Sequence, residues 1–103
     1  MTDRELLELA AKAGGVELGY WCPNNGAFWC GEYWNPLTED GDAFRLAVKL
    51  NVKLVIGGKG FKDFTTWVQA GMSACEEYFN DDPLAATRRA IVRAAAEIGR
   101  GMK

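Results

Sequence analysis

Residues 20–34 read Tyr20-Trp21-Cys22-Pro23-Asn24-Asn25-Gly26-Ala27-Phe28-Trp29-Cys30-Gly31-Glu32-Tyr33-Trp34 and hold six of the twelve aromatic residues of the chain. Asn and Gly accept the positive φ of tight primed turns, so Asn24-Asn25-Gly26 predicts a hairpin with strands near 16–22 and 27–33. Side chains alternate across a strand, so this hairpin has two aromatic faces, and one thin core layer covers only one of them. We therefore expect the other face to meet a partner, a ligand or water.

These aromatic residues are our candidate partner-binding residues, because large rigid rings concentrate binding energy at interfaces. The six candidates are Tyr20, Trp21, Phe28, Trp29, Tyr33 and Trp34. Two other roles stay open for the same rings, namely packing in the core and a contact between copies in a homo-oligomer. The sequence predicts a binding surface without saying what is bound.

Helices are predicted before and after this hairpin. Thr2 and Glu5 have the spacing of a capping box, which predicts a helix over residues 3–13. The acidic stretch 38–42 suits the start of a second helix, where side-chain oxygens cap free amides. A third helix begins at Asp82-Pro83, which supply a cap and a first-turn proline. Its predicted apolar stripe consists of Leu84, Ile91, Ala95 and Ile98, and Gly99 and Gly101 are expected to end it.

Three more strands are expected at 52–56, 61–68 and 72–79, from their β-branched and aromatic composition. The predicted order is α-β-β-α-β-β-β-α. Because hairpins connect the strands, the predicted fold is an α+β domain in which helices pack on one antiparallel sheet. A chain of 103 residues is expected to form a single domain over residues 1–103.

Composition removes several classes of function. The net charge is −2 and there is no His, so nucleic-acid binding is disfavoured and the commonest general base is missing. Three Cys with no His make a structural zinc site improbable on ligand count, and the acidic cluster at 39–42 lacks the spacing of a calcium loop. We expect free thiols at Cys22, Cys30 and Cys75, no metal, no cofactor and no catalysis. No apolar run approaches the ~20 residues of a membrane span, and we expect a cytoplasmic protein.

Four basic residues are candidate anion-binding groups: Lys59, Arg88, Arg89 and Arg93. Arg89 and Arg93 repeat with Arg100 along one side of the third predicted helix, and guanidinium groups suit phosphate. Two structural readings stand beside this one. The arginines can be solvated or paired with acidic residues such as Glu76 and Glu97, and the glycine loop 57–60 that carries Lys59 is typical of a plain hairpin turn.

Two stretches carry a resemblance. Trp34-Asn35-Pro36-Leu37-Thr38-Glu39-Asp40-Gly41-Asp42-Ala43-Phe44-Arg45-Leu46-Ala47-Val48-Lys49-Leu50 and Asp82-Pro83-Leu84-Ala85-Ala86-Thr87-Arg88-Arg89-Ala90-Ile91-Val92-Arg93-Ala94-Ala95-Ala96-Glu97-Ile98-Gly99 resemble small accessory proteins of tailed bacteriophages and prophages. With the similar opening helix, the resemblance covers about half of the chain. It implies a phage gene whose product binds and blocks a host factor. It transfers no functional residue.

Three hypotheses follow. The first is a non-enzymatic phage protein that binds and inhibits or modulates a host or defence protein inside the bacterial cell, with Trp21, Trp29, Tyr33 and Trp34 as anchors. The second is a homo-oligomer that binds or sequesters a small nucleotide, in which Trp34 or Trp67 stacks on the base and Arg88, Arg89 or Lys59 holds phosphate. The third is nucleic-acid binding through the arginines of the last helix.

Overall fold

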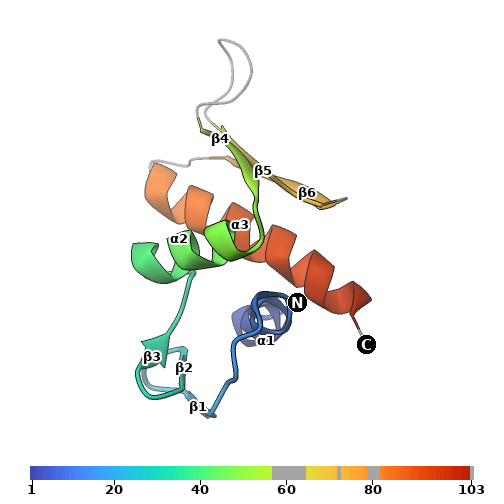
Figure 1. Ribbon diagram of the computed structural model, residues 1–103. Coiled ribbons are helices and arrows are strands. Elements are labelled where there is room, and N and C mark those ends of the chain that lie inside the picture. Colours follow the sequence, from blue (N-terminus) through green and yellow to red (C-terminus); the bar gives the residue numbers. More distant parts are fainter. Residues whose placement is uncertain (57–64, 72, 79–81, 103) are drawn as a thin grey trace.

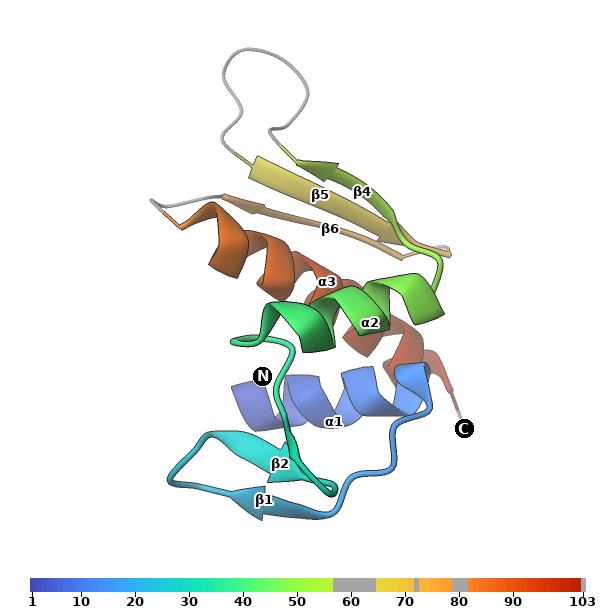
Figure 2. The same ribbon diagram turned by 60° about the vertical axis from the view of Figure 1, so that its left-hand side comes forward.

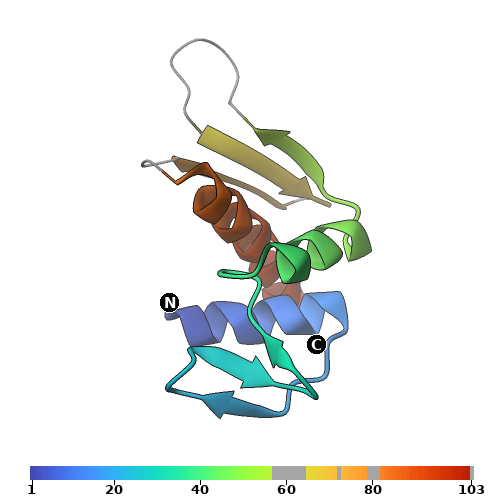
Figure 3. The same ribbon diagram turned by 90° about the vertical axis from the view of Figure 1, so that its left-hand side faces the viewer.

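Three helices lie between two three-stranded antiparallel sheets in the computed structural model, which describes residues 1–56, 65–71, 73–78 and 82–102 (Figure 1). We call the sheet of strands β1, β2 and β3 sheet A, and the sheet of β4, β5 and β6 sheet B. Sheet B packs on α3, α2 lies beside α3 near β4, and α1 lies between these helices and sheet A (Figures 2 and 3). The predicted α+β class is confirmed, but the helices are covered by two sheets instead of one.

The chain forms its elements in the order α-β-β-β-α-β-β-β-α, with one short strand more than predicted. Their bounds are α1 Asp3–Gly14, β1 Tyr20–Cys22, β2 Ala27–Trp29, β3 Tyr33–Trp34, α2 Asp40–Lys49, β4 Lys53–Ile56, β5 Thr65–Ala70, β6 Ser73–Tyr78 and α3 Pro83–Gly101.

Helix α1 begins and ends as its sequence predicts. The Glu5 backbone N–H donates to Thr2 Oγ1 at 3.1 Å, and Glu5 Oε1 accepts from the Thr2 backbone N–H, so both halves of the capping box are present. At the other end Gly15 takes a left-handed conformation with φ of 69°, which glycine adopts without steric cost. The helix places Leu6, Leu7 and Ala10 in the core.

Sheet A has three short strands, whereas the sequence predicted a hairpin of two longer ones. The turn is where we expect it, with the Cys22 carbonyl accepting from the N–H groups of Asn25 and Gly26. Gly26 has φ of 60° whereas both asparagines have negative φ, so the turn is not of the primed type. The strand expected over 27–33 breaks at Gly31, whose φ of 92° reverses the chain and creates β3.

Helix α2 starts in the predicted acidic stretch, but for a different reason. Glu39 is at the N-cap position and makes no side-chain capping hydrogen bond. Asp42, expected to help cap the helix, is buried and accepts from the backbone N–H of Asn35 and from Arg45. Its carboxylate therefore ties α2 to the end of sheet A.

Sheet B confirms the strand predicted at 52–56. Strands β5 and β6 overlap those predicted at 61–68 and 72–79, of which residues 61–64, 72 and 79 lie outside the described residues. Helix α3 starts as predicted, with Asp82 Oδ1 accepting from the Ala85 N–H at 3.0 Å. It continues through Gly99, where an added Cβ would lie 2.0 Å from the Leu9 carbonyl oxygen. Gly99 therefore permits close contact between α1 and α3 and does not end the helix.

The core lies at the junction of α1, α3 and the inner face of sheet B. Leu7, Val68 and Val92 are its largest fully buried aliphatic side chains. Ile91 and Ala95 belong to it as predicted, and Ile98 packs at its edge. Leu84 does not, because its side chain lies exposed in the first turn of α3, beyond the helix surface that contacts the sheet.

Candidate functional site

An outer aromatic ladder, Tyr20, Trp29 and Tyr33, lies on the face of sheet A that is turned away from the helices. Tyr20 is directly opposite Trp29, and Trp29 is directly opposite Tyr33, so the three rings occupy one row across the sheet. The Trp29 and Tyr33 rings meet edge to face with centroids 5.0 Å apart. Tyr20 is 63% exposed and Tyr33 is 49% exposed, and Trp29 between them is half-buried.

The remaining three aromatic residues form an inner row that belongs to the core. Trp21 pairs with Phe28, and Phe28 pairs with Trp34. Phe28 is 4% exposed and Trp34 is 8% exposed, so neither presents a surface to a partner, and the prediction that they are partner-binding residues is wrong. Trp21 is half-buried, packs edge to face on Phe28 and lies beneath the guanidinium of Arg4 at 5.5 Å.

The backbone around the outer ladder is fixed by close contacts. Gly19 precedes Tyr20, and a Cβ at this position would lie 2.0 Å from the Trp29 carbonyl oxygen, so only glycine permits this approach of the chain to β2. Behind the ladder, Asn35 Nδ2 donates to the Gly26 carbonyl at 2.8 Å and joins the end of β3 to the β1–β2 turn. The close approach at Gly19 and the Asn35 hydrogen bond therefore hold the strands that carry the three rings.

A shallow hollow of about 320 Å³ adjoins the outer ladder at the β1–β2 turn. It is lined by Tyr20 and Tyr33, by Trp21 and Cys22, and by the turn residues 23–25. It combines aromatic surface with amide side chains, which is the mixture typical of protein-binding surfaces. Among the described residues that line it, no carboxylate, lysine or histidine stands beside the Cys22 thiol as a base.

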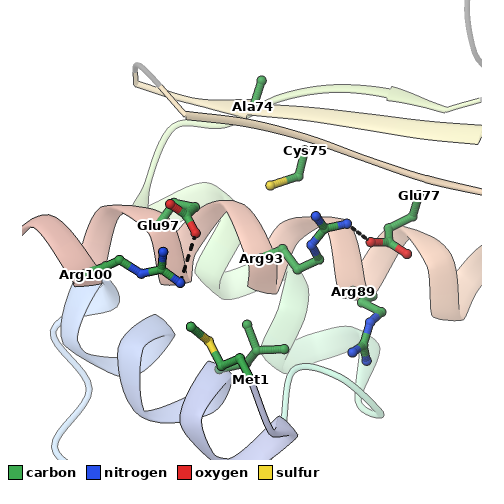
Figure 4. A pocket seen from close by; sticks show the side chains of 9 residues that line it. Met1, Ala74, Cys75, Glu77, Arg89, Arg93, Glu97 and Arg100 are labelled. Carbon is green, nitrogen blue, oxygen red and sulfur yellow. Dashed lines mark hydrogen bonds and ion pairs between the residues drawn. The ribbon is translucent and has the colours of Figure 1, made fainter.

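A larger hollow, of about 670 Å³, lies between α3, β6 and the start of α1 (Figure 4). We call it the arginine hollow, because Arg89, Arg93 and Arg100 line it from α3. Cys75 of β6 points from the sheet toward α3 in this hollow, and Glu77 and Glu97 supply negative charge. The structure thus brings together two of the predicted anion-binding residues, Arg89 and Arg93, and adds Arg100.

Each arginine of the hollow already has a carboxylate partner. Arg93 pairs with Glu77, and this hydrogen bond raises the pKa of the Arg93 guanidinium above its usual value. Arg100 lies 3.4 Å from Glu97, and Arg89 lies 3.4 Å from Asp3. These partly exposed pairs contribute little to stability and leave guanidinium N–H groups for a ligand.

The other two predicted anion-binding residues do not join this hollow. Arg88 donates from Nε to the Leu37 carbonyl at 2.8 Å and from Nη1 to Asp40 at 2.5 Å, so it tethers α3 to the start of α2. The structure gives Arg88 a structural role, and anion binding by Arg88 stays a prediction. Lys59, with the glycine loop 57–60, lies outside the described residues.

The structure separates the two parts of the predicted nucleotide site. Trp67 pairs with Val55 and Glu76 on the outer face of sheet B. Cys75 and Glu77 of the arginine hollow occupy the opposite, inner face of the same sheet, because side chains alternate along β6. A base stacked on Trp67 would be on the wrong side of the sheet for Arg89, and Trp34 is buried.

Three free cysteines are spread over the fold as predicted. Cys22 and Cys30 flank opposite ends of the β1–β2 ladder and are half-buried. Cys75 is buried in sheet B, and this burial raises the pKa of its thiol, partly opposed by the positive charge of Arg93.

Within the described parts of the chain, no helix has the length and apolar character needed to cross a bilayer. Comparison of the chain with protein-family models, with curated proteins and with solved structures gives no match in any of the three cases. Function is therefore inferred from the surfaces described above.

Proposed function

We propose that this protein acts by binding another protein, without catalysis, and that the outer aromatic ladder Tyr20, Trp29 and Tyr33 is its contact surface. The observation that carries the proposal is the row of three paired aromatic side chains on an uncovered sheet face. Tyr and Trp contribute large apolar area with few rotatable bonds and dominate binding at many interfaces. Exposed Glu17 and Glu32, which lie near the ladder in sequence, would orient a partner with a basic rim.

The proposed partner is a host or defence protein inside the bacterial cell. The resemblance of residues 34–50 and 82–99 to accessory phage proteins supports this setting, because such proteins commonly inhibit or modulate a host factor. Asn35 and Asp42 within the first of these stretches are structural, and they hold sheet A against α2. The part of the chain that carries the resemblance therefore includes residues that hold the outer aromatic ladder in place.

The test is capture of a partner by the tagged full chain from host lysate, followed by binding measurements with the purified partner. Trp29→Ala removes the central ring of the ladder and is expected to weaken binding by about thirtyfold or more, the loss typical of a hot-spot residue. Tyr78→Ala is the matched control, because Tyr78 is an exposed aromatic residue of sheet B. Circular dichroism would establish that both variants are folded.

Two results would contradict the proposal. If Trp29→Ala binds the partner as tightly as the original chain, the ladder is not the contact surface. If Tyr78→Ala weakens binding and Trp29→Ala does not, the contact lies on sheet B instead. Loss of binding in Trp29→Ala alone would support the ladder.

A second candidate function is binding of a small anion in the arginine hollow. The specific observation in its favour is that Arg89, Arg93 and Arg100 line one hollow of about 670 Å³. Because Trp67 lies on the opposite face of sheet B, this function involves phosphate or carboxylate recognition without base stacking. Titration with inorganic phosphate, followed by calorimetry, tests it, and Arg93→Ala would abolish any heat that comes from this hollow.

A further inference from the structure

Strand β4 is an edge of sheet B with apolar side chains on both faces. Among the described residues it pairs only with β5, so every second N–H and C=O of β4 points away from the sheet. Soluble proteins usually protect such an edge with charges, prolines or a covering element, because it is a template for another strand. Here the sequence Leu54-Val55-Ile56 follows a single charged residue, Lys53.

The side chains on the inner face of β4 are less buried than those of the neighbouring strand β5. Leu54 lies opposite Val68, and Ile56 lies opposite Thr66, so each pair shares one face of the sheet. Val68 and Thr66 are fully buried, whereas Leu54 is 39% exposed and Ile56 is 60% exposed. The apolar inner face therefore continues to the edge, where the side chains of Leu54 and Ile56 are only partly covered.

Helix α2 adds apolar surface below this edge, and all views place it under β4 (Figures 1, 2 and 3). Arg45 and Lys49 line a hollow beside sheet A. Phe44 and Val48, one turn apart on another side of the helix, are exposed and are directed away from that hollow. Leu54 and Ile56 of the strand and Phe44 and Val48 of the helix near it are thus exposed apolar residues, and we call this part of the described surface the β4 edge.

We infer that the β4 edge binds a second copy of this chain, so that two sheets B join into one six-stranded antiparallel sheet. The pairing is self-complementary about a two-fold axis at Val55. In this register Val55 lies opposite Val55 of the second copy, and Leu54 lies opposite Ile56. Each of these cross-strand positions pairs apolar side chains, which stabilises adjacent strands. A register centred on Lys53 would place two positive charges opposite each other.

A stable two-fold dimer needs more surface than the edge of β4 alone supplies. A stable interface covers roughly 800 Å² on each partner, about an eighth of the 6398 Å² accessible surface of this chain. The edge of a four-residue strand is smaller than this, so the exposed side of α2 must contribute as well. The outer aromatic ladder lies at the opposite end of the molecule (Figure 2), and the dimer would display two ladders that remain free for partners.

Sedimentation velocity of the full chain tests this inference. We expect a species of twice the 11.3 kDa chain mass at micromolar concentration. Ile56→Asp places a charge in the proposed contact and is expected to weaken self-association by about thirtyfold or more. Tyr20→Asp is the matched control, because Tyr20 is 63% exposed and lies on sheet A at the other end of the molecule. This variant is expected to dimerise as the original chain does.

Cysteine cross-linking tests the register, in a chain whose Cys22 and Cys30 are replaced by serine. Val55→Cys is expected to form an intermolecular disulfide with itself on oxidation, because directly opposite Cβ atoms lie about 4.5–5.5 Å apart and a small movement of the two strands brings the sulfur atoms within bonding distance. Leu54→Cys and Ile56→Cys are expected to cross-link when mixed and not separately. A chain that remains monomeric in sedimentation at about 100 micromolar would overturn the inference, because a specific dimer is expected to form well below that concentration. So would a dimer that survives Ile56→Asp unchanged or that cross-links in another register.

Discussion

The carboxylate of Asp42 accepts a hydrogen bond from the backbone N–H of Asn35 at 3.0 Å, and both residues are buried. Asn35 in turn accepts from the Leu37 N–H through Oδ1 and donates to the Gly26 carbonyl through Nδ2. These bonds join the first turn of α2 to the end of β3 and to the β1–β2 turn. The position of sheet A, and with it the outer aromatic ladder, therefore depends on two buried polar side chains.

Replacement of Asp42 by alanine is expected to lower the free energy of unfolding by about 1–3 kcal/mol, because the buried Asn35 N–H would lose its acceptor. Arg45→Ala is the control. Arg45 bonds the other oxygen of the same carboxylate, but its side chain is 68% exposed, so the loss should stay below about 1 kcal/mol. Urea unfolding of both variants measures the difference, and equal losses would show that the Asn35 bond is not the stabilising one.

Gly99 and Gly101 offer a matched pair within α3. An added Cβ at Gly99 would collide with the backbone of Leu9, so Gly99→Ala should destabilise the protein by about 1–3 kcal/mol by forcing α1 and α3 apart. At Gly101 a Cβ meets nothing within 4 Å, and Gly101→Ala should be neutral or stabilising by up to about 1 kcal/mol, because alanine favours the helix. Thermal unfolding measures both. A neutral Gly99→Ala would contradict the close contact of α1 and α3.

Local signals predicted the elements of this fold well, because each depends on neighbouring residues. The capping box at Thr2 and Glu5 and the Asp82-Pro83 start of α3 need only backbone geometry within one turn. The division into two sheets needed long-range information. No pattern within residues 20–34 predicts that the helices will separate them from strands β4, β5 and β6, because that arrangement results from tertiary packing.

The candidate site was predicted as a set of six aromatic residues and is realised as two rows of three. Strand alternation predicted two faces, but which face is buried depends on where α1 lies. The break at Gly31 also mattered, since it places Tyr33 beside Trp29 and Trp34 beside Phe28. The structural role of Arg88 could not be predicted for a similar reason, because its partners Leu37 and Asp40 are some fifty residues away in sequence.

Phe28 and Trp29 are neighbours on opposite faces of β2 and should respond differently to truncation. Phe28→Ala removes a core side chain and is expected to cost about 3–5 kcal/mol of unfolding free energy. Trp29→Ala loses mainly its edge-to-face contact with Tyr33, worth about 1 kcal/mol. Chemical denaturation of the two variants compares them. A loss in Trp29→Ala as large as that in Phe28→Ala would identify the outer ladder as part of the core.

Cys75 should be the least reactive thiol of the chain. Burial raises the pKa of its thiol, so at mildly alkaline pH a smaller fraction is thiolate, the form that reacts with iodoacetamide. The raised pKa also means that the folded state retains this proton to higher pH than the unfolded state. Its contribution to stability is therefore present below the unfolded pKa and lost as pH rises through the folded one.

Mass-spectrometric mapping of alkylation over time, at several alkaline pH values, measures this order of reactivity. Half-buried Cys22 and Cys30 serve as internal controls in the same molecule. Labelling of Cys75 is expected to be the slowest and to catch up only at strongly alkaline pH or after addition of urea. If Cys75 labels as fast as Cys22 in the folded chain, the inner face of sheet B opens to solvent, and the packing of β6 on α3 described here does not persist in solution.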